Sequence, residues 1–176
     1  MVSDSHSEIP EPSDYGPKEV FAFFCLASYQ AQVLEKGIIL MIVAFRCRGL
    51  HITRSEFDVL YAEYNKETLG QLLNRARRLI SIPNDMESLL DEALLKRNWL
   101  MHHYFADRAV QFTTEIGRHL MLSELQSLIR IFTETDHATE SIYTPILEEF
   151  GITEESVEKS IEELIEEYLS DEATEG

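Results

Sequence analysis

The chain has 176 residues, 44% of them apolar, and a formal net charge of −17 at pH 7. Its length and apolar content suit one globular domain with a hydrophobic core, which excludes a wholly disordered chain. The longest purely apolar run, Gly37 to Phe45, is far shorter than the roughly 20 residues that span a bilayer, and the opening residues lack the pattern of a secretion leader. We therefore expect a soluble, cytoplasmic protein with no membrane partner.

Residues 1–16 contain four acidic residues, no basic residue and few apolar ones, a composition that predicts a disordered acidic arm. The folded segment is expected to begin near Pro17, because proline is common in the first turn of a helix. From Val20 to Phe45, apolar side chains recur every three or four residues. This spacing predicts a long amphipathic helix, which Gly49 ends.

Five further helices are expected along the rest of the chain. Thr53 and Glu56 have the spacing of a capping box at the start of the first of these helices. No segment has the alternating apolar pattern of a β-strand, so the predicted fold is an all-α, up-and-down bundle of about five to six helices. The expected segments are approximately 53–64, 69–80, 84–105, 113–150 and 153 onward.

The acidic residues are concentrated at the two ends of the chain. Residues 133–176 contain fifteen acidic residues and one basic residue, whereas 17–132 contain 13 acidic and 14 basic residues. We predict a helical bundle over 17–150 and an acidic C-terminal helix over 151–176 that packs on the bundle or extends from it. The acidic helix either solvates an exposed surface or screens the basic middle of the chain from unsuitable polyanions.

A basic cluster in the middle of the chain also has two interpretations. Arg75, Arg77 and Arg78 lie close together on one predicted helix. They form either a solvated helix face or a surface that follows an RNA backbone.

The segment 97–105 places several polar side chains in an apolar helical pattern. At about 100° per residue, Arg97 falls inside the apolar arc of its helix. Asn98 and His102 are four residues apart on one flank, so their side chains can meet. His103 is expected to point the other way. These positions make Arg97, Asn98 and His102 the candidate site residues.

An arginine directed into an apolar stripe requires a compensating partner, because an unpaired buried charge is costly. Glu35 on the first long helix is the candidate carboxylate, and such a pair would also hold the bundle together. Tyr104, seven residues after Arg97, is expected to stack on the guanidinium.

These residues resemble the Arg-x-x-x-x-His-x-Tyr motif of HEPN-domain proteins, in which an asparagine often follows the arginine. The likeness extends to the first helix with Glu35 and to the helix start at 68–72, and it covers about residues 17–132. The matching motif residues are Arg97, Asn98, His102 and Tyr104.

The resemblance implies a metal-independent endoribonuclease without a cofactor, often a toxin or a defence component, that acts as a homodimer on RNA. Arg97 would bind the phosphoryl oxygens, and His102 would transfer protons near neutral pH. Asn98 would orient His102 or the phosphate. Tyr104 resembles the tyrosine that a partner nucleotidyltransferase, acting as antitoxin, modifies with adenylate in toxin pairs of this family.

The sequence also departs from the family pattern. His103 duplicates the histidine, although the helical phase favours His102 as the reactive one. The strongly negative charge fits a catalytically silent relative better than a nuclease, because phosphate contacts supply most of the affinity for RNA. The alternative is therefore a helical dimerisation or regulatory protein in which the motif binds a nucleotide or holds the interface.

Overall fold

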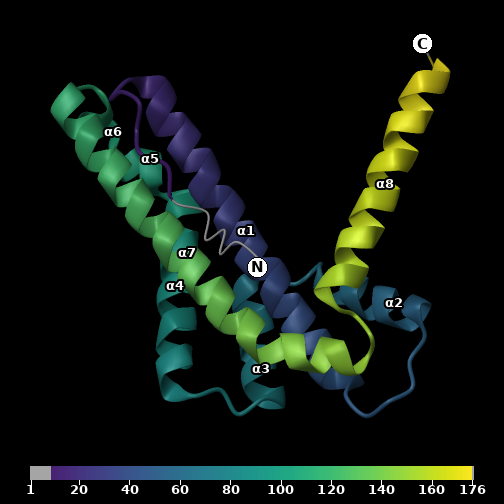
Figure 1. Cartoon of the computed structure of the whole chain (residues 1–176). Helices are drawn as coiled ribbons and strands as arrows, with labels where there is room; N and C mark the ends of the chain where they lie inside the picture. Colours follow the sequence, from purple (N-terminus) through teal and green to yellow (C-terminus); the bar gives the residue numbers. More distant parts are fainter. Residues whose placement is uncertain (1–8, 176) are drawn as a thin grey trace.

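The structure, a computed structural model, describes residues 9–175 of the chain and the side chains as far as residue 170 (Figure 1). This part of the chain contains eight helices and no strand, so the predicted all-α class is confirmed. The helices are α1 (Pro17–Cys47), α2 (Arg54–Tyr64), α3 (Leu69–Leu79), α4 (Asn84–His102), α5 (Tyr104–Asp107), α6 (Ala109–Phe112), α7 (Glu115–Glu149) and α8 (Glu154–Glu175).

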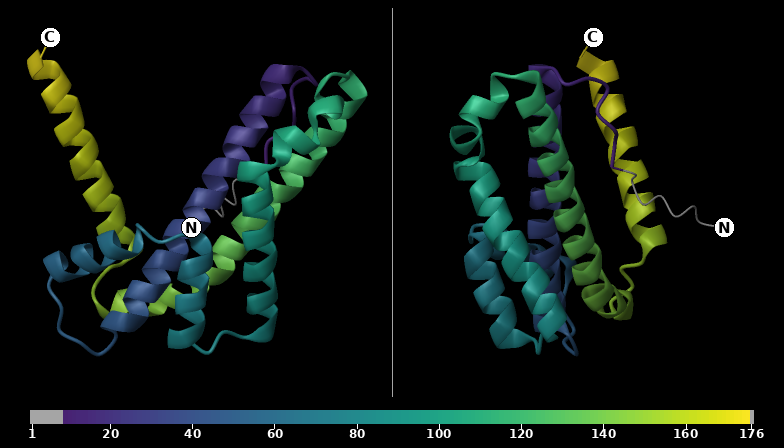
Figure 2. Two further views of the ribbon diagram at one scale, coloured as in Figure 1. Left: turned by 180° about the vertical axis from the view of Figure 1, so that it is seen from behind. Right: turned by 90° about the vertical axis from the view of Figure 1, so that its left-hand side faces the viewer.

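Two long helices, α1 and α7, form the centre of the bundle and run side by side in the same direction, while α4 runs in the opposite direction (Figures 1 and 2). The apolar stripe predicted for α1 faces this centre, and Val20, Ile38 and Ile42 are fully buried there. Leu125 and Phe132 of α7 are also fully buried. The three- and four-residue spacing thus places one face of each helix in a common core.

Helix α1 is also the one helix in the described chain that is long and apolar enough, by composition, to cross a membrane. Half of its most apolar window is buried inside the molecule. Its apolar character therefore has an explanation in the packing against α7.

The helix ends follow local signals in the sequence. The Thr53 side chain accepts a hydrogen bond from the Glu56 amide at 3.3 Å, and the Thr53 amide donates to the Glu56 carboxylate at 2.7 Å. These bonds confirm the predicted capping box, and the bond from the Thr53 amide lowers the pKa of the Glu56 carboxyl. Gly49 and Gly151 follow α1 and α7 with φ of 75° and 76°, a conformation that favours glycine and ends both helices where the sequence predicts.

Residues 9–16 form no helix or strand, yet hydrogen bonds connect them to α7. Arg118 Nε donates to the Tyr15 carbonyl at 2.6 Å, and Gln126 Nε2 donates to the Pro10 carbonyl at 3.1 Å. This half of the expected disordered arm therefore makes specific contacts with the bundle. The other half, residues 1–8, lies outside the described residues.

Helix α8 extends away from the bundle, so that the molecule has the shape of an open V (Figures 1 and 2). Of the two arrangements expected for the acidic C-terminal helix, the structure shows extension. All side chains of α8 from Glu154 to Ser170 are exposed except Ser156, which is half-buried.

Asp136 of α7 faces the centre of the bundle, where a Cβ atom added to Gly37 of α1 would lie 2.6 Å from its Oδ1 atom. Burial raises the pKa of the Asp136 carboxyl; Glu140 raises it further, and His137 lowers it. A carboxyl whose folded-state pKa is raised favours folding below the unfolded-state pKa of about 3.9. That contribution is lost as the pH rises through the folded-state pKa.

We therefore expect Asp136→Asn to be more stable than the parent chain at pH 7, with the difference closing as the pH falls below about 4. Urea unfolding between these pH values measures the effect. Asp58→Asn, at an exposed position of α2, is the control and should show no such pH-dependent gain. A less stable Asp136→Asn at pH 7 would contradict the assignment.

Candidate active site

Arg97 lies near the C-terminal end of α4 with a side chain that is 25% exposed. Its Nη2 atom is 3.2 Å from Oε2 of Glu35 on α1, which is 20% exposed. Its Nη1 atom donates to Asn98 Oδ1 at 3.3 Å. The expected pairing of Arg97 with Glu35 is thus confirmed, and the guanidinium is held on one side by α1 and on the other by its own neighbour.

The two histidines lie next to each other where α4 ends. His102 is the last residue of the helix, and His103 leaves it with φ of −130°. Both side chains are exposed, and their ring centroids are 6.3 Å apart. The predicted helix through 105, with His103 directed away from His102, is therefore wrong. The helical phase applies only as far as His102, where the helix stops.

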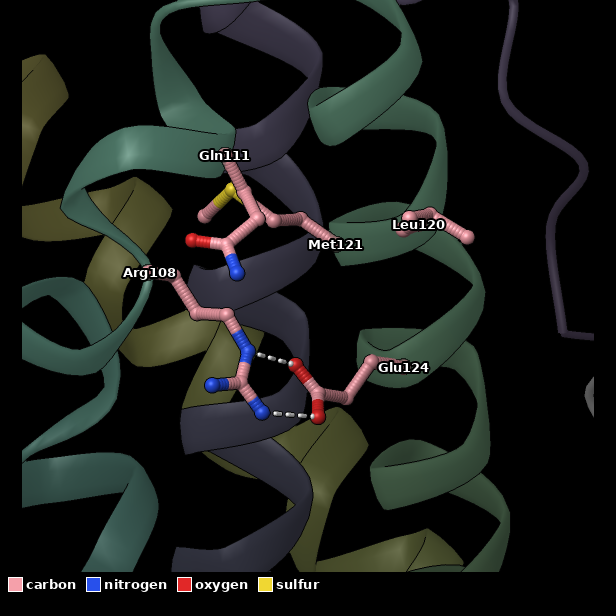
Figure 3. Close-up of a pocket in the computed structure, with 5 residues that line it drawn as sticks. All are labelled: Arg108, Gln111, Leu120, Met121 and Glu124. Carbon is pink, nitrogen blue, oxygen red and sulfur yellow. Dashed lines mark hydrogen bonds and ion pairs between the residues drawn. The ribbon is translucent and has the colours of Figure 1, made fainter.

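A network of side chains holds the chain in this turn after His102. Trp99 Nε1 donates to Asp107 Oδ2 at 2.8 Å, and the Arg108 guanidinium lies over the Trp99 ring at 5.0 Å. Arg108 also donates two hydrogen bonds to Glu124 of α7, at 2.9 and 2.7 Å (Figure 3). Such a bidentate pair fixes both position and orientation. The network closes the chain into the one-turn helices α5 and α6 in place of a longer α4.

The position of the Tyr104 side chain differs from the one that the sequence predicts. Its side chain is 1% exposed, and its hydroxyl donates to the Met121 carbonyl of α7 at 3.1 Å. Its ring packs on Trp99 and Phe24, with centroids 5.1 and 5.8 Å away, and burial raises the pKa of the phenol. The expectations that Tyr104 stacks on Arg97 and presents its hydroxyl for modification do not agree with this geometry. The helix end at His102 turns Tyr104 into the core.

The surface beside the motif includes exposed apolar side chains of the same helix. Leu95 and Met101 are 70% and 44% exposed, and Asn98 and His102 are exposed near them. At about 100° per residue, Leu95, Asn98 and His102 lie within about 60° of one another, so this face of α4 combines one exposed apolar side chain with two polar ones. A separate hollow of about 310 Å³ lies on the α7 side of the turn, around Arg108 (Figure 3).

The basic cluster of α3 is largely compensated by acidic residues. Arg75 pairs with Glu67, and Arg77 Nε lies 3.0 Å from Glu87 Oε1. Arg78 Nε donates to a backbone carbonyl of its own helix at 3.0 Å. These contacts favour the interpretation of the cluster as a paired helix face, because each guanidinium already has an acceptor.

Arg108 and Trp99 are the residues of this region that sequence reasoning did not select. Their contacts join segments on the two sides of a helix end, so no spacing along a single helix indicates them. The one available signal is the acidic and basic pair Asp107 and Arg108 directly after the motif. Comparison with known proteins adds no assignment, since no family model, curated protein or solved structure matches the chain.

Proposed function

We propose that the protein is a HEPN-like, metal-independent endoribonuclease of the toxin or defence type that acts as a homodimer. The observation that supports this most is the position of Arg97, which Glu35 and Asn98 hold on the helix end that presents His102 and His103. A fixed guanidinium and two exposed imidazoles on one short stretch of chain supply the charges and proton carriers that RNA cleavage requires.

In this proposal the 2′-hydroxyl of RNA attacks its own phosphorus atom. One imidazole takes the hydroxyl proton, the bond from phosphorus to the 5′-oxygen breaks, and a second imidazole gives a proton to that oxygen. The products are a 2′,3′-cyclic phosphate and a 5′-hydroxyl. Arg97 binds the phosphoryl oxygens, on which negative charge increases in the transition state. Asn98 orients His102, four residues away on the same face.

The second imidazole has two possible sources in this arrangement. His103 of the same chain is one, because its ring is the neighbour of the His102 ring. His102 of a second copy is the other, if the exposed face of α4 with Leu95 and His102 pairs with its counterpart across a two-fold axis.

The Arg97–Glu35 pair also supports a second candidate function, a catalytically silent dimerisation or regulatory protein. In that case the ion pair joins α4 to α1 and the histidines take part only in an interface. The net charge of −17 favours this alternative, because it repels RNA.

Cleavage of a labelled RNA by the purified chain in excess chelator separates the two candidates. We expect cleavage that His102→Ala lowers by about 10²- to 10⁴-fold, the usual contribution of a general acid or base. An equal loss of cleavage in His103→Ala identifies the two histidines of one chain as the acid and base pair. Full cleavage by His103→Ala favours His102 from two copies. His119→Ala, at an exposed histidine on α7, is the matched control. Absence of cleavage by the parent chain would favour the silent alternative.

A further inference from the structure

Helix α8 has an exposed apolar stripe. Val157, Ile161, Leu164 and Ile165 are 45%, 50%, 63% and 52% exposed. The spacing of four, three and four residues from Val157 through Leu164 to Tyr168 is that of a coiled-coil seam. A seam of this kind is typical of a helix that packs against another helix along its length.

The stripe continues into a groove at the base of α8. The groove has a volume of about 590 Å³ and lies between α2, the end of α7 and the start of α8. Val157 and Ile161 belong to both the stripe and the groove, so the two form one continuous apolar surface. The other apolar side chains that line it include Leu40, Ile52, Phe57, Leu147 and Phe150.

Acidic side chains surround this surface. Between residues 154 and 170, α8 has seven glutamates and one basic residue, Lys159. Viewed down the helix at about 100° per residue, Glu158 lies on one side of the stripe and Glu167 on the other. In paired helices, charged residues at these flanking positions determine which partner helix binds, because they form salt bridges with it.

The same glutamates destabilise α8 when it stands alone. Glu154, Glu158, Glu162 and Glu166 follow one another at intervals of four residues, a spacing at which like charges repel on a helix. The Lys159–Glu163 pair, at 3.8 Å with both side chains well exposed, offsets little of this repulsion. A basic partner would therefore relieve the charge repulsion and cover the apolar stripe in one contact.

We propose that α8 and the groove at its base are a docking surface for an amphipathic helix of another protein, one whose apolar stripe is flanked by lysine or arginine. The charges favour this occupant over a second copy of the chain. Pairing two α8 helices would bring two sets of seven glutamates together, which like-charge repulsion opposes. The proposal does not depend on the function of the motif in α4.

The experiment uses the full chain and three labelled synthetic peptides about as long as α8, which has 22 residues. The first has leucines at the four, three and four spacing with lysines on both flanks. The second replaces these lysines with glutamates. The third has the composition of the first in a scrambled order without an apolar stripe, and it controls for attraction of any basic peptide to the negative chain.

We expect the lysine-flanked peptide alone to bind, with an affinity that falls as ionic strength rises from about 0.05 to 0.5 M. Ile161→Ser combined with Leu164→Ser should weaken binding at least tenfold, roughly the effect of 1.4 kcal/mol. Val110→Ser combined with Ile116→Ser, which changes apolar residues that are still more exposed and lie elsewhere, should leave it unchanged. Glu158→Lys combined with Glu167→Lys should shift the preference toward the glutamate-flanked peptide.

Because residues 161 and 164 are exposed, the serine variants are expected to keep the bundle folded, and circular dichroism checks this. Equal binding of the scrambled peptide would overturn the proposal, since net charge alone would then account for the association. Sedimentation of the free chain as a dimer that the serine variants of α8 dissociate would also overturn it and make a second copy the occupant.

Discussion

Replacing Arg97 with alanine is expected to lower RNA cleavage by about 10²- to 10³-fold, the usual loss when a fixed donor to a developing negative charge is removed. The guanidinium is already positioned by Glu35 and Asn98, at 3.2 and 3.3 Å. A lysine at this position would carry the charge without the planar pair of donors, so Arg97→Lys should recover only a small part of the activity.

A control of matched stability separates a catalytic role of Arg97 from a structural one. Loss of a partly buried ion pair that has hydrogen bonds costs about 1–3 kcal/mol, whichever function the motif has. Arg77→Ala is the matched control, because Arg77 is 29% exposed and pairs with Glu87 at 3.0 Å. We expect Arg77→Ala to destabilise the chain similarly and to leave cleavage unchanged. Equal effects of both variants on cleavage would contradict a catalytic role for Arg97.

The variant Glu35→Gln tests whether the Glu35 carboxylate competes with RNA phosphate for Arg97. The amide can still accept a hydrogen bond from Arg97, but it no longer competes with a phosphate for the positive charge. If the motif is catalytic, the Glu35→Gln variant should cleave RNA at the parent rate and bind RNA more tightly. If Glu35 only joins α1 to α4, the variant should lose stability and show no other effect.

Replacing Gly117 with alanine is expected to cause the largest loss of stability among the substitutions considered. A Cβ atom at Gly117 would lie 2.1 Å from the carbonyl oxygen of Gln111 and 2.5 Å from its Cα atom. These are backbone atoms, so relief of the clash requires α6 to move away from α7. We expect a loss of about 3 kcal/mol, at the upper end of the usual cost of overpacking, measured by urea unfolding.

Gly70→Ala is the control for this substitution. Its Cβ atom would meet only Leu94 Cδ2 at 4.0 Å, an ordinary van der Waals contact. Alanine also restricts the unfolded chain, so this variant should be neutral or more stable by up to about 1 kcal/mol. Similar unfolding midpoints for the two alanine variants would rule out the close contact of α6 with α7.

Local signals made most of the helices predictable. The Thr53 capping box and the glycines at 49 and 151 act through a few neighbouring residues, so their effects are readable in the sequence. The Arg97–Glu35 pair was also predictable, because an arginine inside an apolar arc requires a compensating partner and Glu35 was the candidate carboxylate. Each of these features can be predicted from residues within one helix or from one strong physical requirement.

The end of α4 was not predictable in the same way. The apolar pattern continues to residue 105, and the contacts that turn the chain join Trp99 to Asp107 and Arg108 to Glu124. Spacing along one helix cannot indicate contacts of this range. The pairing of His102 with His103 and the burial of Tyr104 both follow from this turn. Similarly, the apolar stripe of α8 predicts that this helix packs against another helix. It does not show that the bundle leaves the stripe uncovered.

During synthesis, α1 is complete at residue 47, whereas its main packing partner α7 is complete only at residue 149. At roughly 5–20 residues per second, this delay lasts roughly 5–20 seconds. For that time the nascent chain presents a 31-residue helix with the length and hydropathy of a membrane span and no α7 to cover it. The order of the helices thus leaves the apolar face of α1 without its main cover for most of synthesis, although the finished bundle buries that face.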